Sequence, residues 1–113
     1  MFYKTNDEQL NISIDEFVNE WYDKEEYLLI DIREDSDKEE SGGSIKGSFD
    51  ISMYEIPDKI DMAPTYIVCI VVCEDGTKSK QIAQFAVNHE LNNVFYLEGG
   101  AVELLNAIPG LKV

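Results

Sequence analysis

The strongest constraint on the fold is one apolar run in the middle of the chain. Residues Tyr66–Val72 contain no charge, and the polar segment Cys73–Ser79 follows them at once. Because β-branched residues favour strands, and because an unbroken apolar strand is buried on both faces, the run predicts a central strand of a parallel sheet. Ligands bind such sheets at the carboxyl edge, which is where this strand delivers Cys73.

Strand-like and helix-like segments alternate along the rest of the chain. Further strands are predicted around Leu10–Ile12, Tyr27–Ile32, Ser48–Ile51 and Val94–Leu97. Helices are predicted from the capping box at Ser13–Glu16 to about Tyr22, from Ser79 to Leu91, and from Gly99-Gly100 to about Ala107. Pro57 limits residues 53–60 to a short helix or a turn, and the acidic segment Glu34–Ser44 predicts a solvated loop.

This order predicts an α/β fold with a mostly parallel central sheet and helices on both faces. The 113 residues are enough for one core, so residues 1–113 are expected to form one compact domain. Trp21 falls in an apolar helical stripe and is expected in that core. His89, the only histidine, is expected at a helix surface, and neither a metal nor a cofactor is expected.

The charge of the chain excludes some classes of function. The formal net charge is −14, and residues 1–62 carry 18 acidic against 6 basic side chains. Phosphate backbones and anionic lipid repel such a surface, so nucleic-acid and membrane partners are not expected, whereas a basic partner protein remains open. The first residues lack the pattern of a secretory signal, and no apolar stretch is long enough to span a bilayer, so a cytoplasmic protein is expected.

The thiol of Cys73 is placed for nucleophilic chemistry. It lies in a short turn before a predicted helix, whose N-terminal amides favour a thiolate. Cysteine-dependent phosphatases carry Arg six positions after the Cys, where this chain has Ser79, so a phosphatase is disfavoured. The segment lacks the glycine spacing of a Walker A loop, so nucleotide binding is not expected. It also lacks the second Cys of a thioredoxin motif, so dithiol redox chemistry is not expected. Cys69 is four residues away on the same strand, about 13 Å, too far for a disulfide.

Four segments in order resemble the rhodanese family. They are Leu29–Glu34, Gly43–Ser48, Val71–Cys73 with Gly76 and Ser79, and Asn93–Gly100. The resemblance runs from about Ile12 to Leu105 and implies a sulfurtransferase. In that activity a Cys73 thiolate takes sulfane sulfur from thiosulfate, a polysulfide or a protein persulfide. The resulting persulfide then passes the sulfur to cyanide or a thiol.

The resemblance also implies which residues bind the donor. They are the loop residues Glu74, Asp75, Gly76, Thr77, Lys78 and Ser79. Arg33 is a further candidate because it lies at the carboxyl end of its predicted strand. Arg33 either faces the pocket or pairs with Glu34 or Asp50. Glu74 and Asp75 repel thiosulfate, and the single cation Lys78 opposes them, so thiosulfate turnover is predicted to be weak and a neutral persulfide or a protein is the favoured donor. The alternative is a weakly active or inactive rhodanese-like binding or regulatory module.

Overall fold

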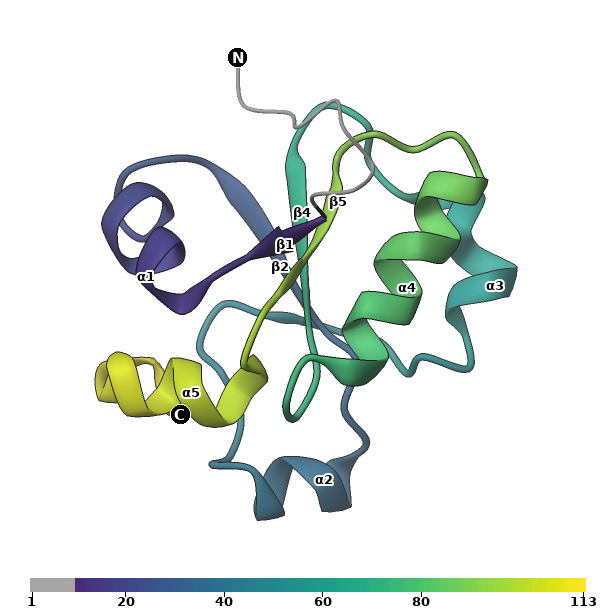
Figure 1. The fold of residues 1–113 in the computed structure, drawn as a ribbon. Helices are drawn as coiled ribbons and strands as arrows, with labels where there is room; N and C mark the ends of the chain where they lie inside the picture. The colour runs from purple at the N-terminus through teal and green to yellow at the C-terminus, as the bar shows by residue number, and fades with distance from the viewer. Residues whose placement is uncertain (1–9) are drawn as a thin grey trace.

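A five-stranded sheet forms the centre of the computed structural model, which describes residues 10–113 (Figure 1). All pairs are parallel and the strand order is β1-β5-β4-β2-β3. The strands are β1 Asn11–Ile12, β2 Tyr27–Asp31, β3 Phe49–Asp50, β4 Val68–Val72 and β5 Val94–Leu97. The α-helices are α1 Ile14–Glu16, α2 Asp35–Glu40, α3 Ile56–Lys59, α4 Thr77–Asn88 and α5 Gly100–Ala107.

The predicted central strand is confirmed. All five residues of β4 are buried, and β4 pairs with β2 on one side and β5 on the other, with Val71 opposite Ile30 and Tyr96. Successive side chains of β4 point to opposite faces of the sheet. Ile70 and Val72 pack on the side of α1 and α5, and Cys69 and Val71 on the side of α3 and α4 (Figure 1). The sheet is therefore covered by helices on both faces, as predicted.

The first predicted helix differs in its geometry. Ser13 does cap it, because its hydroxyl accepts the Glu16 N–H at 3.0 Å. After one α-helical turn, however, the chain widens into a π-helical turn, Phe17–Trp21, closed by the Tyr22 N–H on the Phe17 carbonyl at 2.8 Å. Phe17 and Trp21, the first and last residues of this turn, are buried. The centres of their rings lie 5.3 and 6.4 Å from that of Tyr27. Trp21 is thus in the core, as expected.

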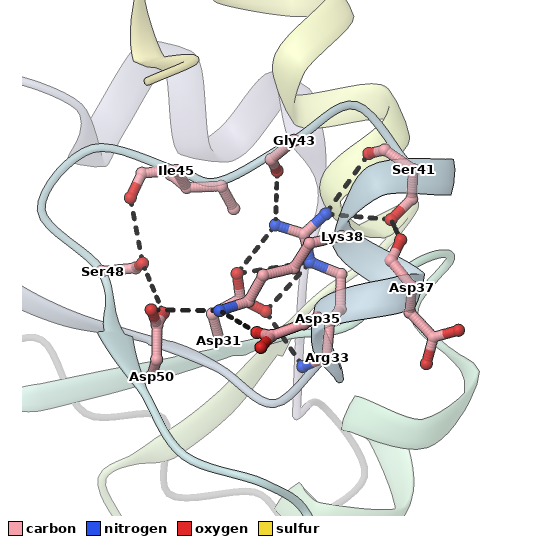
Figure 2. Close-up of polar contacts among 10 residues, drawn as sticks. All are labelled: Asp31, Arg33, Asp35, Asp37, Lys38, Ser41, Gly43, Ile45, Ser48 and Asp50. Carbon is pink, nitrogen blue, oxygen red and sulfur yellow. Dashed lines mark hydrogen bonds and ion pairs between the residues drawn. The ribbon is translucent and has the colours of Figure 1, made fainter.

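The prediction of a solvated loop over Glu34–Ser44 is wrong, since this segment contains α2. Asp35 and Asp37 lie in its first turn, where the helix dipole favours negative charge. Lys38 pairs with Asp50 of β3 at 3.1 Å, so the helix is tied to the sheet edge (Figure 2). Such a short helix depends on tertiary contacts of this kind. Across residues 10–113, none of the helices is long and apolar enough to cross a membrane.

Candidate active site

The Cys73 sulfur is held by the loop that follows it. Cys73 is the first residue after β4 and is fully buried. Its Sγ accepts the backbone N–H of Gly76 at 3.2 Å and that of Ser79 at 3.3 Å. The thiol also lies 3.4 Å from the Ser79 hydroxyl, which donates to the Gly76 carbonyl at 3.2 Å. Two amide dipoles at the start of α4 therefore point at the sulfur and favour negative charge on it.

Gly76 has to be glycine for the loop to turn onto the sulfur. Its φ of +98° lies in the left-handed region, and a Cβ there would be 3.2 Å from the Gly99 backbone nitrogen. A side chain would therefore be both strained and crowded.

The start of α5 fixes the loop from the other side. The Ala101 N–H donates to the Cys73 carbonyl at 2.8 Å, and the Val102 N–H donates to the Glu74 carbonyl at 3.3 Å. Gly100 makes this approach possible, because a Cβ at its φ of +67° would lie 2.4 Å from the Glu74 carbonyl oxygen. Sequence reasoning took Gly99-Gly100 only as a helix start and a family motif. It missed that these residues and Ala101 anchor the loop.

The two loop acids have different partners. Glu74 pairs with Lys78 at 3.5 Å, the i,i+4 spacing of a helical ion pair. Asp75 instead accepts the Thr77 N–H on Oδ1 at 3.0 Å, and this hydrogen bond holds the pKa of the Asp75 carboxyl below its ordinary value. The Asp75 carboxylate thus takes up the Thr77 N–H, one of the amides that an anionic donor would need. The Lys78 ammonium, the cation of the loop, is already paired with Glu74.

A hollow of about 380 Å³ lies beside the loop. Asp75, Gly76 and Thr77 form one wall, and the other lining residues are Lys80, Gln81, Tyr96, Glu98 and Gly99. Its charged residues are two acids, Asp75 and Glu98, and one base, Lys80, so the hollow is poorly suited to a dianion. The structure thus brings together Cys73 and the six loop residues named from the sequence, with this hollow at their outer side.

Arg33 is not brought to the loop by the contacts that the structure describes. It is buried, and its Nε and Nη2 donate to the buried carboxylate of Asp31 at 3.0 and 2.8 Å (Figure 2). Nη1 donates to the Ser41 hydroxyl at 2.9 Å and to the Ser41 carbonyl at 3.4 Å, and Nη2 donates to the Gly43 carbonyl at 2.8 Å. The ion pair is therefore with Asp31 and not with Glu34 or Asp50. In this arrangement all five guanidinium N–H groups are used within the protein.

Cys69 is set apart from Cys73 by its environment. It is a free, buried thiol inside β4, and burial raises its pKa from 9.0 to about 11. A raised pKa in the folded protein means that this residue's contribution to stability is complete below pH 9 and is lost as the pH rises through 11. Cys69 is thus a neutral packing residue at neutral pH.

We expect wild-type protein to lose more stability between pH 8 and pH 11 than Cys69→Val, because only the wild-type protein has the Cys69 thiol, which ionises at a lower pH in the unfolded chain than in the fold. Urea unfolding at both pH values measures this difference. The pKa values of Tyr27 and Tyr96 are also raised by burial, but both proteins contain these residues, so their effect cancels in the comparison. Parallel stability profiles of the two proteins would contradict the assignment.

Comparison with known proteins identifies the family to which this fold belongs. Residues 14–107 match the family described as the Rhodanese-like domain. The protein SSP1007 from Staphylococcus saprophyticus subsp. saprophyticus is 26% identical, covers 83% of this chain and 91% of its own, and superposes with a TM-score of 0.68. A rhodanese-like domain protein from Staphylococcus aureus is 23% identical, with 83% and 89% covered and a TM-score of 0.68.

A third similar structure is an NAD-dependent persulfide reductase from A. fulgidus. It is 21% identical, with a TM-score of 0.61, and the match covers 83% of this chain but 15% of the reductase. No curated protein sequence matches the chain. The family match spans most of the described residues, and the parallel sheet covered by helices agrees with it. The chain therefore belongs to the rhodanese-like domain family.

Proposed function

We propose that the protein is a sulfurtransferase that carries sulfur on Cys73. The observation that carries the proposal is the pair of backbone N–H groups, from Gly76 and Ser79, that point at a buried sulfur at the carboxyl end of the central strand. Family membership supports the same chemistry. The similarity to one part of a persulfide reductase agrees with a persulfide as the intermediate.

The reaction consists of two displacements at sulfur. In the first, the Cys73 thiolate attacks the outer sulfur of a donor, forms a new S–S bond and breaks the donor's own, whose electron pair leaves with the donor remnant (sulfite, if the donor is thiosulfate). In the second, a thiolate or cyanide attacks the outer sulfur of the persulfide, and Cys73 leaves as a thiolate. The Gly76 and Ser79 amides stabilise the negative charge on sulfur as attacking and leaving group.

A persulfide on Cys73 tests the proposal directly. After incubation with a polysulfide or thiosulfate, mass spectrometry should show a gain of about 32 Da, the mass of one sulfur atom, on the peptide that contains Cys73. Cys69 is in the same tryptic region, so fragmentation must separate the two thiols, and Cys73→Ser serves as the control. If neither donor gives the adduct, the proposal fails.

The acids of the loop are expected to set the choice of donor. We expect Glu74→Gln with Asp75→Asn to raise kcat/KM for thiosulfate by about two- to tenfold, because two negative charges beside the thiol, one half-buried and one exposed, are removed. The amide oxygen of the introduced asparagine would still accept the Thr77 N–H, so this hydrogen bond before α4 is kept. Turnover of a donor with one negative charge, an alkanethiosulfonate anion that leaves as a sulfinate, should rise less than that of thiosulfate.

Two further variants make the comparison specific. Asp75→Asn alone should give only part of the gain, because Glu74→Gln also releases the Lys78 ammonium from its ion pair. Asp58→Asn, an exposed change of charge outside the loop, should have no effect on either donor. An unchanged or lower rate with thiosulfate in the double variant would show that these acids do not face the donor.

One observation favours a second function. Cys73 is fully buried and does not line the adjacent hollow, so a donor has no open path to the sulfur in this conformation. A rhodanese-like module that binds a basic partner through its acidic surface would not need such a path. The two functions are separated by the persulfide experiment, since a binding module gives no adduct on Cys73.

A further inference from the structure

A second hollow lies on the face of the sheet that α3 and α4 cover. Its volume is about 300 Å³, and its walls come from β2, β4, α3 and the 3-10 turn Ile60–Met62. Among the described residues that line it, Lys59 is the only one with a charge or a strong hydrogen-bonding group in its side chain, and all the others are apolar. The hollow therefore selects for hydrocarbon, and it offers one place for a polar group.

The size of the hollow limits the ligand. It is about twice the ~150 Å³ of a cavity that takes up benzene, so it has room for roughly ten to twelve carbon atoms. Phe49 and Met62 belong to the lining and are 53% and 79% exposed, so the hollow reaches the protein surface. A ligand can therefore enter with its apolar end first and leave its polar end at the rim.

Lys59 supplies a positive charge near the polar end of a bound ligand. Its side chain is about half exposed, and its described ion pair, with Glu55, is long at 3.8 Å. Asp58 and Asp61 are its neighbours in sequence, but neither they nor Glu55 line the hollow. An anionic group of a ligand at the rim can therefore pair with the Lys59 ammonium. The hydrocarbon chain of the same ligand then contacts only apolar side chains.

We propose that this hollow binds a medium-chain aliphatic carboxylate, with its chain among the apolar side chains of the sheet and its carboxylate at Lys59. Cys73 itself does not line the hollow. Val71, which does, precedes Cys73 by two residues along extended chain, about 7 Å. Binding does not require a reactive Cys73, so the result is independent of the persulfide experiment.

Isothermal titration calorimetry with hexanoate, octanoate, decanoate and tetradecanoate, each below its micellar concentration, tests the proposal. Each added methylene should tighten binding about fourfold until the hollow is full, at about ten to twelve carbons, after which the gain should stop. Lys59→Met should weaken decanoate about two- to fivefold and leave decanol unchanged. Ala63→Trp, which fills the hollow from its rim, should abolish binding of both.

Three outcomes would overturn the proposal. Affinity that rises without a break to tetradecanoate would indicate adsorption to the surface, and decylamine binding more tightly than decanoate would reverse the assigned charge. Unchanged decanoate binding by a folded Ala63→Trp would place the ligand elsewhere. Circular dichroism checks the fold of this variant, and Ile51→Trp, at another half-buried position of the lining, replaces it if it does not fold.

Discussion

Cys73→Ser is expected to reduce sulfur transfer to the background rate while it leaves the fold intact. A serine hydroxyl is a poor nucleophile without a general base, and it cannot form the persulfide. The same hydroxyl oxygen can still accept the N–H groups of Gly76 and Ser79, which now bind the sulfur at 3.2 and 3.3 Å. Turnover assays with two donors and urea unfolding measure the two properties separately.

Cys73→Ala separates the role of the sulfur in stability from its role in the reaction. Alanine leaves both buried N–H groups without this acceptor, and an unpaired buried amide costs about 1–3 kcal/mol. We therefore expect Cys73→Ala to be less stable than Cys73→Ser, although both are inactive. Turnover by either variant would exclude Cys73 as the sulfur carrier. Equal stability of the two variants would show that the amides do not depend on the sulfur.

The sequence was sufficient to predict those parts of the fold that depend on neighbouring residues in the chain. The apolar run before Cys73 predicted a buried strand, and its polar ending predicted the turn and helix that hold the thiol. The acidic segment around α2 was misread because its charges have partners that only the fold brings near, such as Asp50 for Lys38. The π-helical turn after α1 was also missed, since it depends on two rings packing against Tyr27.

The candidate site shows the same limit. The sequence located Cys73 and Gly76, but the anchoring of the loop by Ala101 joins segments that are distant in the chain. The partner of Arg33 had a local signal. Asp31 is the last residue of β2 and precedes Arg33 by only two residues, and its Oδ1 also accepts the Arg33 N–H at 3.0 Å. This closeness in the sequence was available as a signal, and the pair is the one buried ion pair that the structure describes.

Arg33→Met is expected to lower the free energy of unfolding by about 3–5 kcal/mol, because it leaves the carboxylate of Asp31 buried without its cation. The change also removes the donors to Ser41 and Gly43, which hold the segment after α2 (Figure 2). Urea unfolding gives the magnitude. Asp31→Leu alone should cost a similar amount, because it leaves the guanidinium without its anion.

The double variant, Asp31→Leu with Arg33→Met, decides between an ion-pair role and a donor-binding role for Arg33. If the two residues serve each other, the double variant should lose much less stability than the two single variants together, since neither charge is left alone. KM for the sulfur donor should then be the same in Arg33→Met and Asp31→Leu, measured where both are folded. If KM rises only when Arg33 is replaced, the guanidinium binds the donor. If the losses of stability in the two single variants add up in the double variant, the ion pair is not the reason that both residues are buried.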